Sequence, residues 1–153
     1  MSAPTTQHTY TIKEAAALTG LPASTLRYYE SIGVIAPISR GATSKHRVYD
    51  EDDLDQLMWV ACLASTGMSV EDMRQYMANA QRGPAAAGEQ VGLLSEQERR
   101  LAYEAGQIAL RQRYVRLKID YWRAIEADDA PRAELLSAEA RTLADQLKRP
   151  RKH

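Results

Sequence analysis

A line of apolar residues at seven-residue spacing constrains the fold of this chain more than any other feature. Its members are Leu94, Leu101, Ile108, Val115 and Trp122. Spacing of this kind places side chains on one face of an α-helix and is typical of helices that pair as coiled coils. A helix over residues 94–126 would be about 50 Å long, at about 1.5 Å per residue. Because so small a chain cannot bury a face of that length within itself, the pattern predicts pairing with a second copy.

A second apolar line lies roughly opposite the first on the same predicted helix. It consists of Tyr103, Leu110, Tyr114, Leu117 and Tyr121. We expect one face to meet a partner copy, parallel or antiparallel, and the other to meet the body of the chain or a C-terminal helix. Polar residues (Gln97, Glu104, Arg111 and Lys118) stand three positions after the first four members of the first line, so the seam is narrower than in an ideal zipper. A three-helix bundle that closes within one chain is the alternative.

Turn-forming residues divide the chain on both sides of the long helix. The stretch over residues 81–92 holds four glycines and prolines and is expected to be a linker. It would join a first domain at residues 9–80 to a dimerisation helix at 93–127. Asp128-Asp129-Ala130-Pro131 should end that helix before a C-terminal helix at 131–148. The final helix carries one apolar stripe, formed by Leu136, Ala140, Leu143 and Leu147.

The first domain opens with the pattern of a helix-turn-helix. Thr11 and Glu14 have the spacing of a capping box, which predicts a first helix from about Ile12 to Leu18. Gly20 permits a sharp turn, and a second helix should follow between Pro22 and Gly33. Hydroxyl, tyrosine and arginine side chains on such a second helix are typical of a major-groove reader. The candidate DNA-binding residues on the two helices are Lys13, Ser24, Thr25, Arg27 and Tyr28.

A small, polar and basic segment follows the second helix. Residues 39–47 favour a β-hairpin or loop of the kind called a wing, which would lay basic side chains against DNA phosphates. An ordinary solvated loop is the alternative. The candidate DNA-binding residues of this segment are Lys45, His46, Arg47 and Tyr49.

An acidic block separates the basic segment from two further predicted helices. Asp50 is a suitable N-cap, and the acids after it suit the positive end of a helix dipole, so the block need not hold a metal. Leu54, Leu57, Met58, Ala61 and Cys62 recur at helical spacing and predict the buried face of that helix. Ser69 should cap the next helix, whose apolar face carries Val70, Met73, Tyr76 and Met77.

Charge and composition narrow the class of protein. Net charge is zero, yet residues 1–49 carry five Lys/Arg against two acids, whereas residues 50–80 carry one against seven. The positive charge therefore coincides with the predicted DNA reader. The sequence contains no apolar run long enough for a membrane span and no signal-peptide pattern, and a single cysteine fits a reducing cytoplasm. Without a recognisable catalytic set or phosphate-cradling loop, an enzyme is not expected, and neither is a cofactor.

Taken together, the motifs of residues 9–80 resemble the MerR-type transcriptional regulators. The segments that stand in the order and spacing of that family are Tyr10-Thr11-Ile12-Lys13-Glu14, Thr25-Leu26-Arg27-Tyr28-Tyr29-Glu30, Gly33-Val34-Ile35-Ala36-Pro37, His46-Arg47-Val48-Tyr49 and Gly67-Met68-Ser69-Val70-Glu71-Asp72-Met73. The resemblance implies an all-α fold with a small β wing: a winged helix-turn-helix head and a long dimerisation helix that forms an antiparallel coiled coil.

The resemblance also implies a function. A homodimer would bind a palindromic double-stranded promoter with an overlong spacer and twist it so that RNA polymerase can engage. Arg27 and Tyr28 would then contact DNA backbone and base edges, and Arg47 and Tyr49 would clamp phosphate. The family usually has Ser or Thr where this chain has Pro22, so a side-chain N-cap is lost, although proline is tolerated in a first helical turn.

The signal is less constrained than the DNA binding. Metal-sensing members of the family use thiolates near the dimer helix, and this chain has only Cys62 and the dispersed histidines His8, His46 and His153, so no metal site is expected. The stretch around Cys62 resembles the aldehyde- and thiol-stress-responsive branch, which implies a thiol sensor; a core cysteine is the alternative. Two other functions stay open: a regulator that binds an apolar ligand among Trp59, Tyr76, Tyr103 and Trp122, and a coiled-coil protein that does not bind DNA.

Overall fold

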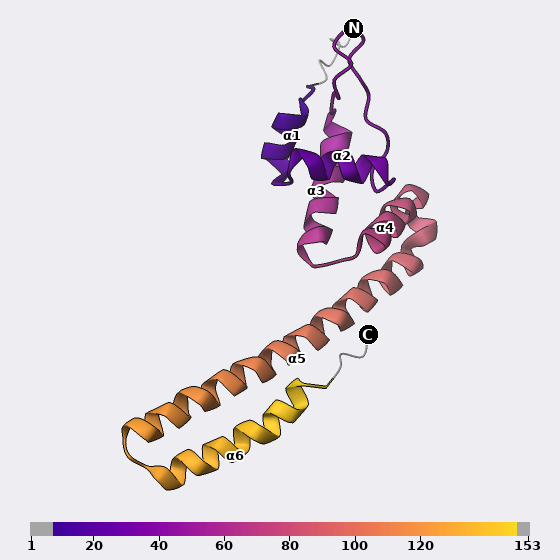
Figure 1. The fold of residues 1–153 in the computed structure, drawn as a ribbon. Helices are drawn as coiled ribbons and strands as arrows, with labels where there is room; N and C mark the ends of the chain where they lie inside the picture. The colour runs from indigo at the N-terminus through magenta and orange to yellow at the C-terminus, as the bar shows by residue number, and fades with distance from the viewer. Residues whose placement is uncertain (1–7, 150–153) are drawn as a thin grey trace. The chain divides into compact units, whose positions relative to one another are not determined.

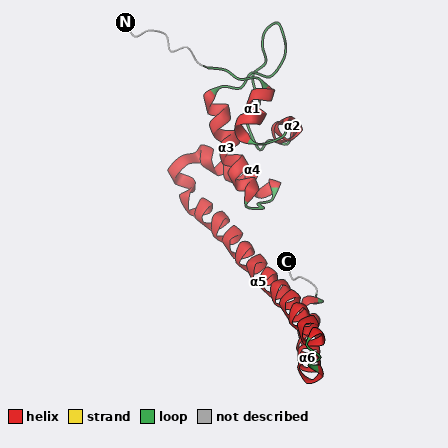
Figure 2. Cartoon of the chain, turned by 90° about the vertical axis from the view of Figure 1, so that its left-hand side faces the viewer, coloured by secondary structure: helices red, strands yellow, loops and turns green. Residues whose placement is uncertain are grey.

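The computed structural model describes residues 8–149 and is built from helices connected by loops (Figure 1). Two compact units divide the chain, residues 1–97 and residues 98–153. The elements are α1 (Ile12–Thr19), α2 (Ala23–Ser31), α3 (Glu51–Ser65), α4 (Val70–Arg82), the 3₁₀ turn η1 (Gly83–Ala86), α5 (Ala87–Glu126) and α6 (Ala130–Leu147). Over residues 8–149 only helices and loops are present (Figure 2). His153, one of the dispersed histidines, falls outside the described residues.

The predicted helix starts of the first unit are confirmed by their capping contacts. The Thr11 hydroxyl accepts a hydrogen bond from the Glu14 backbone N–H at 3.2 Å, and the Glu14 carboxylate accepts one from the Thr11 N–H at 3.1 Å. Asp50 and Asp53 make the same reciprocal pair at the start of α3, and Ser69 caps α4. Each contact satisfies a backbone donor that would otherwise lack a partner at the helix end.

Glycine and proline set the boundaries of α2. Gly20 adopts φ 74°, a left-handed conformation that ends α1 and turns the chain into α2. Pro22 occupies the N-cap position of α2 and makes no side-chain capping bond there, as expected. After Ser31 the chain passes through Gly33 at φ 80°, which closes the helix.

The core of the first unit joins α1, α2, α3 and α4. Its most deeply buried large side chains include Leu26 of α2, Leu57 of α3 and Met73 of α4. The predicted apolar face of α4 is confirmed, because Met73 and Met77 are buried and Val70 and Tyr76 pack against the core. Packing of α1 against both α2 and α3 therefore gives the helix-turn-helix a rigid support.

The predicted buried face of α3 is wrong at two positions. Leu54, Leu57 and Val60 are buried, whereas Met58 and Cys62 are exposed. Each residue of an α-helix is turned by about 100° from the last, so Met58 lies well away from its neighbour Leu57. The three-residue spacing of Leu54, Leu57 and Val60 defines the face that meets the other helices.

Residues 81–92, which were expected to form an irregular linker, are mostly helical. Helix α4 continues to Arg82, the irregular segment is only the single turn Gly83–Ala86, and α5 begins at Ala87. Gly83, at φ 68°, ends α4, and Pro84 lies in the first turn of the 3₁₀ segment, where proline is tolerated. The alanines that follow favour helix strongly enough for Gly88 and Gly92 to be absorbed into a helix of 40 residues.

In the second unit α6 packs along α5. The buried residues are Leu117 and Ala124 of α5 with Ala133, Leu136, Ala140 and Leu143 of α6. Asp128, at φ 55°, makes the turn, and Asp129 caps α6 by accepting a hydrogen bond from the Arg132 N–H at 3.2 Å. The second apolar line and the stripe on α6 are thus confirmed as one interface, although Tyr103 is exposed.

The seven-residue line on α5 is exposed throughout. Leu94, Leu101, Ile108, Val115 and Trp122 all present their side chains to solvent, with Trp122 64% exposed. Of the two predicted faces of the helix, one is therefore covered by α6 and the other by nothing within residues 8–149. Among the same residues, no helix combines the length and apolar character that crossing a bilayer requires.

Candidate nucleic-acid interface

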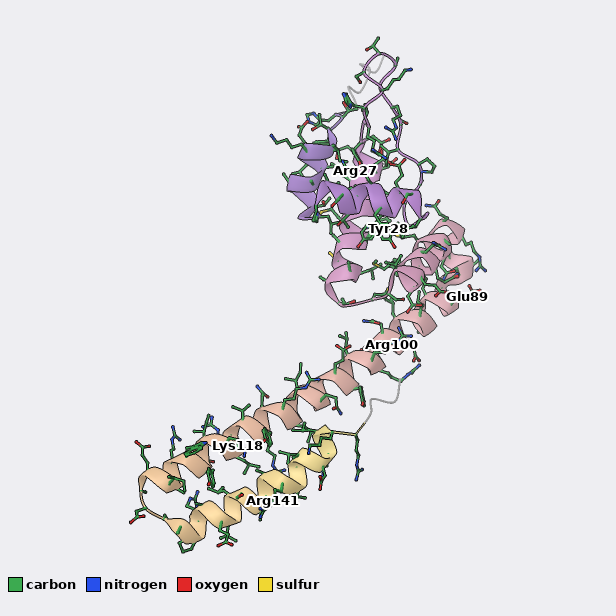
Figure 3. The ribbon with its side chains drawn as sticks, viewed as in Figure 1. Arg27, Tyr28, Glu89, Arg100, Lys118 and Arg141 are labelled. Carbon is green, nitrogen blue, oxygen red and sulfur yellow. The ribbon has the colours of Figure 1, made fainter. Side chains whose placement is uncertain are left out.

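Helix α2 presents a polar face whose opposite side is anchored in the core. Leu26 and Tyr29 are buried, and this orientation leaves Arg27 and Tyr28 exposed on the other side (Figure 3). Ser24 is also exposed, and Thr25 is half-buried at the first turn. Because Leu26 and Tyr29 are three residues apart and anchor one face of the helix, the two residues between them are held on the opposite face.

The segment after α2 is attached to the core before it turns outward. Val34, Ile35 and Ile38 are buried and hold the chain against the helices. Beyond them the loop folds back on itself: the Gly41 N–H donates to the His46 carbonyl at 2.9 Å, and the Val48 N–H donates to the Ser39 carbonyl at 2.8 Å. The segment thus forms a closed loop with one isolated antiparallel bridge, between Arg40 and Arg47. Because residues 8–149 include no regular strand, the predicted β wing is not confirmed.

The tip of this loop carries two of the predicted basic residues. Lys45 and His46 are exposed, and Lys45 adopts φ 57°. A Cβ at Gly41 would lie 2.6 Å from the Ser44 Oγ, so a larger residue there would require the Ser44 side chain to shift. Lys13 of α1 is exposed as well. The structure therefore leaves the cationic groups of α1, α2 and the loop accessible, as binding to phosphate requires.

A partly buried ion pair connects the loop to α2. Arg47 donates from Nε to Glu30 Oε1 at 2.6 Å, and the Ile38 N–H donates to Glu30 Oε2 at 3.1 Å. The two side chains are only 20% and 14% exposed. Burial opposes ionisation of Glu30, yet the hydrogen bonds from Arg47 and Ile38 and the charges of Arg47 and Arg40 outweigh it and lower the pKa of Glu30.

Glu30 was not among the residues that the sequence indicated for the site. The available signal was that it is one of only two acids in the first 49 residues, within an otherwise basic region. Arg47, predicted to contact phosphate, is instead engaged with Glu30 through Nε. A guanidinium has five N–H donors, so this pair uses only part of its capacity. The pair positions the loop relative to α2.

Tyr49 requires a correction. It was predicted to clamp phosphate, but its side chain is fully buried in the core of the first unit. Its backbone pairs with Tyr10 through two hydrogen bonds, at 2.8 and 2.9 Å, which turns the ring inward. Burial raises the pKa of Tyr49, and its hydroxyl has no hydrogen-bond partner among residues 8–149. At this position the ring supports the interface from beneath.

The residues considered for signal recognition are dispersed. Cys62 is exposed on α3, so it is not a core residue of this chain. Within residues 8–149 no three His, Cys, Asp or Glu side chains are grouped to hold a metal ion. Of the aromatics considered for an apolar ligand, Tyr76 packs against the core of the first unit. Trp59 of the first unit and Tyr103 and Trp122 of the second are exposed.

Comparison with known proteins agrees with the helix-turn-helix geometry. Residues 10–80 match the model of the MerR HTH family of regulatory proteins. The HTH-type transcriptional regulator AdhR of Bacillus subtilis is 33% identical over 90 residues, which are 59% of this chain and 64% of AdhR. An HTH-type transcriptional regulator of Haemophilus influenzae is 32% identical over 109 residues, 71% of this chain and 78% of that protein. The chain therefore spans slightly less than two thirds of the length of AdhR and more than two thirds of the length of the Haemophilus protein.

Solved structures share the fold. HiNmlR, a MerR family regulator that lacks the sensor domain and was crystallised bound to promoter DNA, is 25% identical, with a TM-score of 0.62. The match covers 78% of this chain and 94% of HiNmlR. A MerR family transcriptional regulator from Listeria monocytogenes is 27% identical, with a TM-score of 0.66 over 85% of this chain and 98% of its own.

The Glu30–Arg47 pair makes the stability of the first unit depend on pH. Because the pKa of Glu30 is lowered on folding, the pair stabilises above the ordinary value of 4.5 and is lost as the pH falls through the lowered pKa. We expect Glu30→Gln to reduce the free energy of unfolding by about 1–2 kcal/mol at pH 7, and by less as the pH falls below that value. Denaturant unfolding at several pH values measures this. Asp55→Asn, at an exposed carboxylate, is the control, and an equal loss in both variants would contradict the assignment.

The buried hydroxyl of Tyr49 allows a test of its revised role. We expect Tyr49→Phe to leave stability unchanged or raise it by up to about 1 kcal/mol, because the substitution removes a buried polar group without a partner. The affinity for promoter DNA should change by less than about twofold, since the ring is retained. A loss of affinity at unchanged stability would instead show that the hydroxyl reaches a phosphate when DNA is bound.

Proposed function

Because the chain belongs to the MerR HTH family of regulatory proteins, we propose that it is a transcriptional regulator that binds a palindromic promoter as a homodimer. The observation that carries the proposal is α2, whose buried face leaves Arg27 and Tyr28 exposed beside a basic loop. A helix of this kind reads base edges in the major groove, while cations on neighbouring elements bind phosphates. The promoter-bound relative HiNmlR supports the same use of the fold.

In this proposal the loop over residues 39–47 acts as the wing. Lys45 and His46 at its tip contact phosphates beside the groove, and Arg47 keeps the loop in register with α2 through Glu30. Phosphate contacts determine the orientation of the protein, and the contacts of α2 supply the sequence preference. Lys13, Ser24 and Thr25 supply further contacts from the first helix and the first turn of the second.

The exposed face of α5 is the proposed dimer interface. A line of five apolar side chains over four heptads is stable in water only when it is covered, and a second copy offers a matching surface. Charge favours an antiparallel pair. Residues 87–104 carry four acids and two arginines, whereas residues 105–126 carry five Lys/Arg and two acids. Antiparallel pairing therefore places the acidic part of each helix opposite the basic part of the other.

A dimer with two reading helices can change the geometry of its promoter. Binding both half-sites at once forces the DNA between them to bend or twist when its relaxed geometry does not fit, and the phosphate contacts supply the energy. In this proposal the regulator twists an overlong spacer so that RNA polymerase can engage. Polymerase is then an indirect partner, which recognises the altered DNA.

We further propose that a reactive electrophile or oxidant is the signal and that Cys62 receives it. The supporting observation is the exposure of Cys62, which gives a reagent in solution access to the thiol. Its place on α3, between the reading helices and the start of α5 in the sequence, suits a modification that alters the geometry of the dimer. A regulator that senses an apolar ligand is the alternative.

Replacing Arg27 tests the DNA-binding proposal. We expect Arg27→Ala to weaken binding to the palindromic promoter by roughly tenfold or more and to reduce the slope of log K against log salt by about 1. Arg74→Ala, at an exposed arginine of α4, removes the same charge away from the proposed interface and should leave both quantities nearly unchanged. Fluorescence anisotropy over a salt series measures both variants.

Two results would contradict this proposal. Unchanged affinity of Arg27→Ala, with retained binding to a protein partner, would favour a coiled-coil protein that does not bind DNA. A strictly monomeric protein in sedimentation experiments that still bound the palindrome with full affinity would exclude the dimer.

Cys62→Ser tests the proposed signal. We expect the variant to bind the upstream promoter of its own gene as the wild type does, and to lose the change in footprint that aldehydes or oxidants cause. Serine keeps the size of the side chain but lacks the nucleophilic thiol. Unchanged induction in Cys62→Ser would exclude the thiol mechanism and leave the DNA-binding proposal intact.

A further inference from the structure

A chain of side-chain amides joins α4 to the first turns of α5. Gln75 Nε2 donates to Asn79 Oδ1 at 2.8 Å, and Asn79 Nδ2 donates to Gln90 Oε1 at 3.1 Å. Gln90 Nε2 then donates to the backbone carbonyl of Tyr76 at 2.9 Å. Asn79 is only 2% exposed, and its amide links Gln75 to Gln90 in the middle of this hydrogen-bonded series. All of these residues belong to the first unit.

Another amide attaches α5 two turns further along. Gln97 Nε2 donates to the carbonyl of Thr66 at 2.9 Å, at the C-terminal end of α3. Gln97 and Asn79 are the buried polar side chains within residues 8–149. Gln90 and Gln97 are seven residues apart and thus lie on the same face of α5. The start of α5 is therefore held to both α4 and α3.

Hydrogen bonds of this kind constrain direction more than apolar contacts do. An apolar surface tolerates small rotations of one helix on another, whereas a buried amide that loses its partner is strongly penalised. Buried polar groups can in this way select one arrangement of helices without adding much stability. By contrast, the ion pair of Arg82 with Glu89 spans the same two helices at 2.6 Å but is half-exposed on both sides and constrains little.

We propose that Asn79, Gln90 and Gln97 determine which half-site spacing the regulator accepts, by fixing the direction in which α5 leaves the DNA-binding unit. They are positioning residues, because they act through α5 and do not touch DNA. This inference rests on the proposed function. In a dimer that pairs along α5, a change in the direction of α5 changes the separation and the relative rotation of the two α2 helices.

DNA provides a sensitive measure of such an error. Each base pair inserted between two half-sites moves them apart by about 3.4 Å and rotates one against the other by about 35°. A rigid joint therefore restricts the dimer to one spacing, unless the DNA itself is deformed. A loosened joint accepts neighbouring spacings more evenly, while the contacts within each half-site are unchanged.

The test replaces the amides by side chains of similar size. Asn79→Leu/Gln90→Leu removes both partners together, so that neither is left buried and unpaired, and the fold is expected to be retained. Affinity is measured on a series of duplexes whose half-site spacing differs by single base pairs. We expect the wild type to prefer one spacing by roughly tenfold over its neighbours and the double variant by less than about twofold. Gln97→Met, which removes the contact with Thr66, should also weaken the preference for one spacing.

Matched controls separate geometry from stability. Arg82→Ala/Glu89→Ala removes the exposed pair across the same helices and should keep the wild-type spacing profile. Because Cys62 is the proposed sensor, the nitroxide is attached at the exposed position Asp55→Cys in a Cys62→Ser background, in which each copy carries one cysteine, and it reports the distance between the two DNA-binding units without DNA. We expect the distance distribution from double electron–electron resonance to be narrow in wild type and control, and broader in the double variant.

The outcomes distinguish this inference from the proposal on which it depends. A folded, dimeric double variant with the wild-type spacing profile and an equally narrow distance distribution would overturn the role of the amides. A wild type that binds no duplex of the series, or gives no dipolar signal between copies, would overturn the proposed dimeric regulator itself.

Discussion

The exposed apolar face of α5 is the constraint on which the rest of the structure depends. The helix has two apolar faces, and α6 supplies enough apolar surface to cover one of them. Leu101, Ile108, Val115 and Trp122 on the other face stay in contact with water, at a free-energy cost that pairing removes. Because α6 covers only one apolar face of α5, the helical hairpin of the second unit does not form a closed bundle.

In the DNA-binding unit, helix α2 likewise has one buried face and one exposed face. Burial of Leu26 and Tyr29 orients α2, and the ion pair of Glu30 with Arg47 ties the basic loop to the same helix. Glu30, one of two acids within residues 1–49, therefore stabilises the arrangement of the basic loop relative to α2. Tyr49 belongs to the same support, as a buried ring beneath the surface that it was expected to form.

Much of the fold was predictable because it is determined by local chemistry. The capping residues Thr11, Asp50 and Ser69 act on backbone groups within three residues of themselves, so their pattern is readable in the sequence. The break between α5 and α6, at residues 127–129, likewise depends on residues close to it in the sequence. The exposed candidates Lys13, Ser24, Arg27, Tyr28, Lys45 and His46 also lie where the predicted elements would place them, although their contacts with DNA remain predictions.

The errors arise where distant parts of the chain decide the outcome. Met58 and Cys62 have apolar or neutral side chains, but their side of α3 is exposed among the described residues, because α1 and α4 pack against the helix elsewhere. Tyr49 turns inward because its backbone pairs with Tyr10, 39 residues earlier. The expected linker is largely helical, and the amides of Gln90 and Gln97 hold the start of α5 against the preceding helices through contacts that residue spacing does not reveal.

The sequence by itself determined the helices, their caps, the two apolar faces of α5 and the resemblance to a regulator family, because each depends on residue spacing along one element. Only the tertiary structure decided which apolar face is covered, which arginine is tied to Glu30, and that Asn79 is buried at a joint between helices. Those properties depend on pairs of residues far apart in the chain, and spacing along a single element carries no information about such pairs.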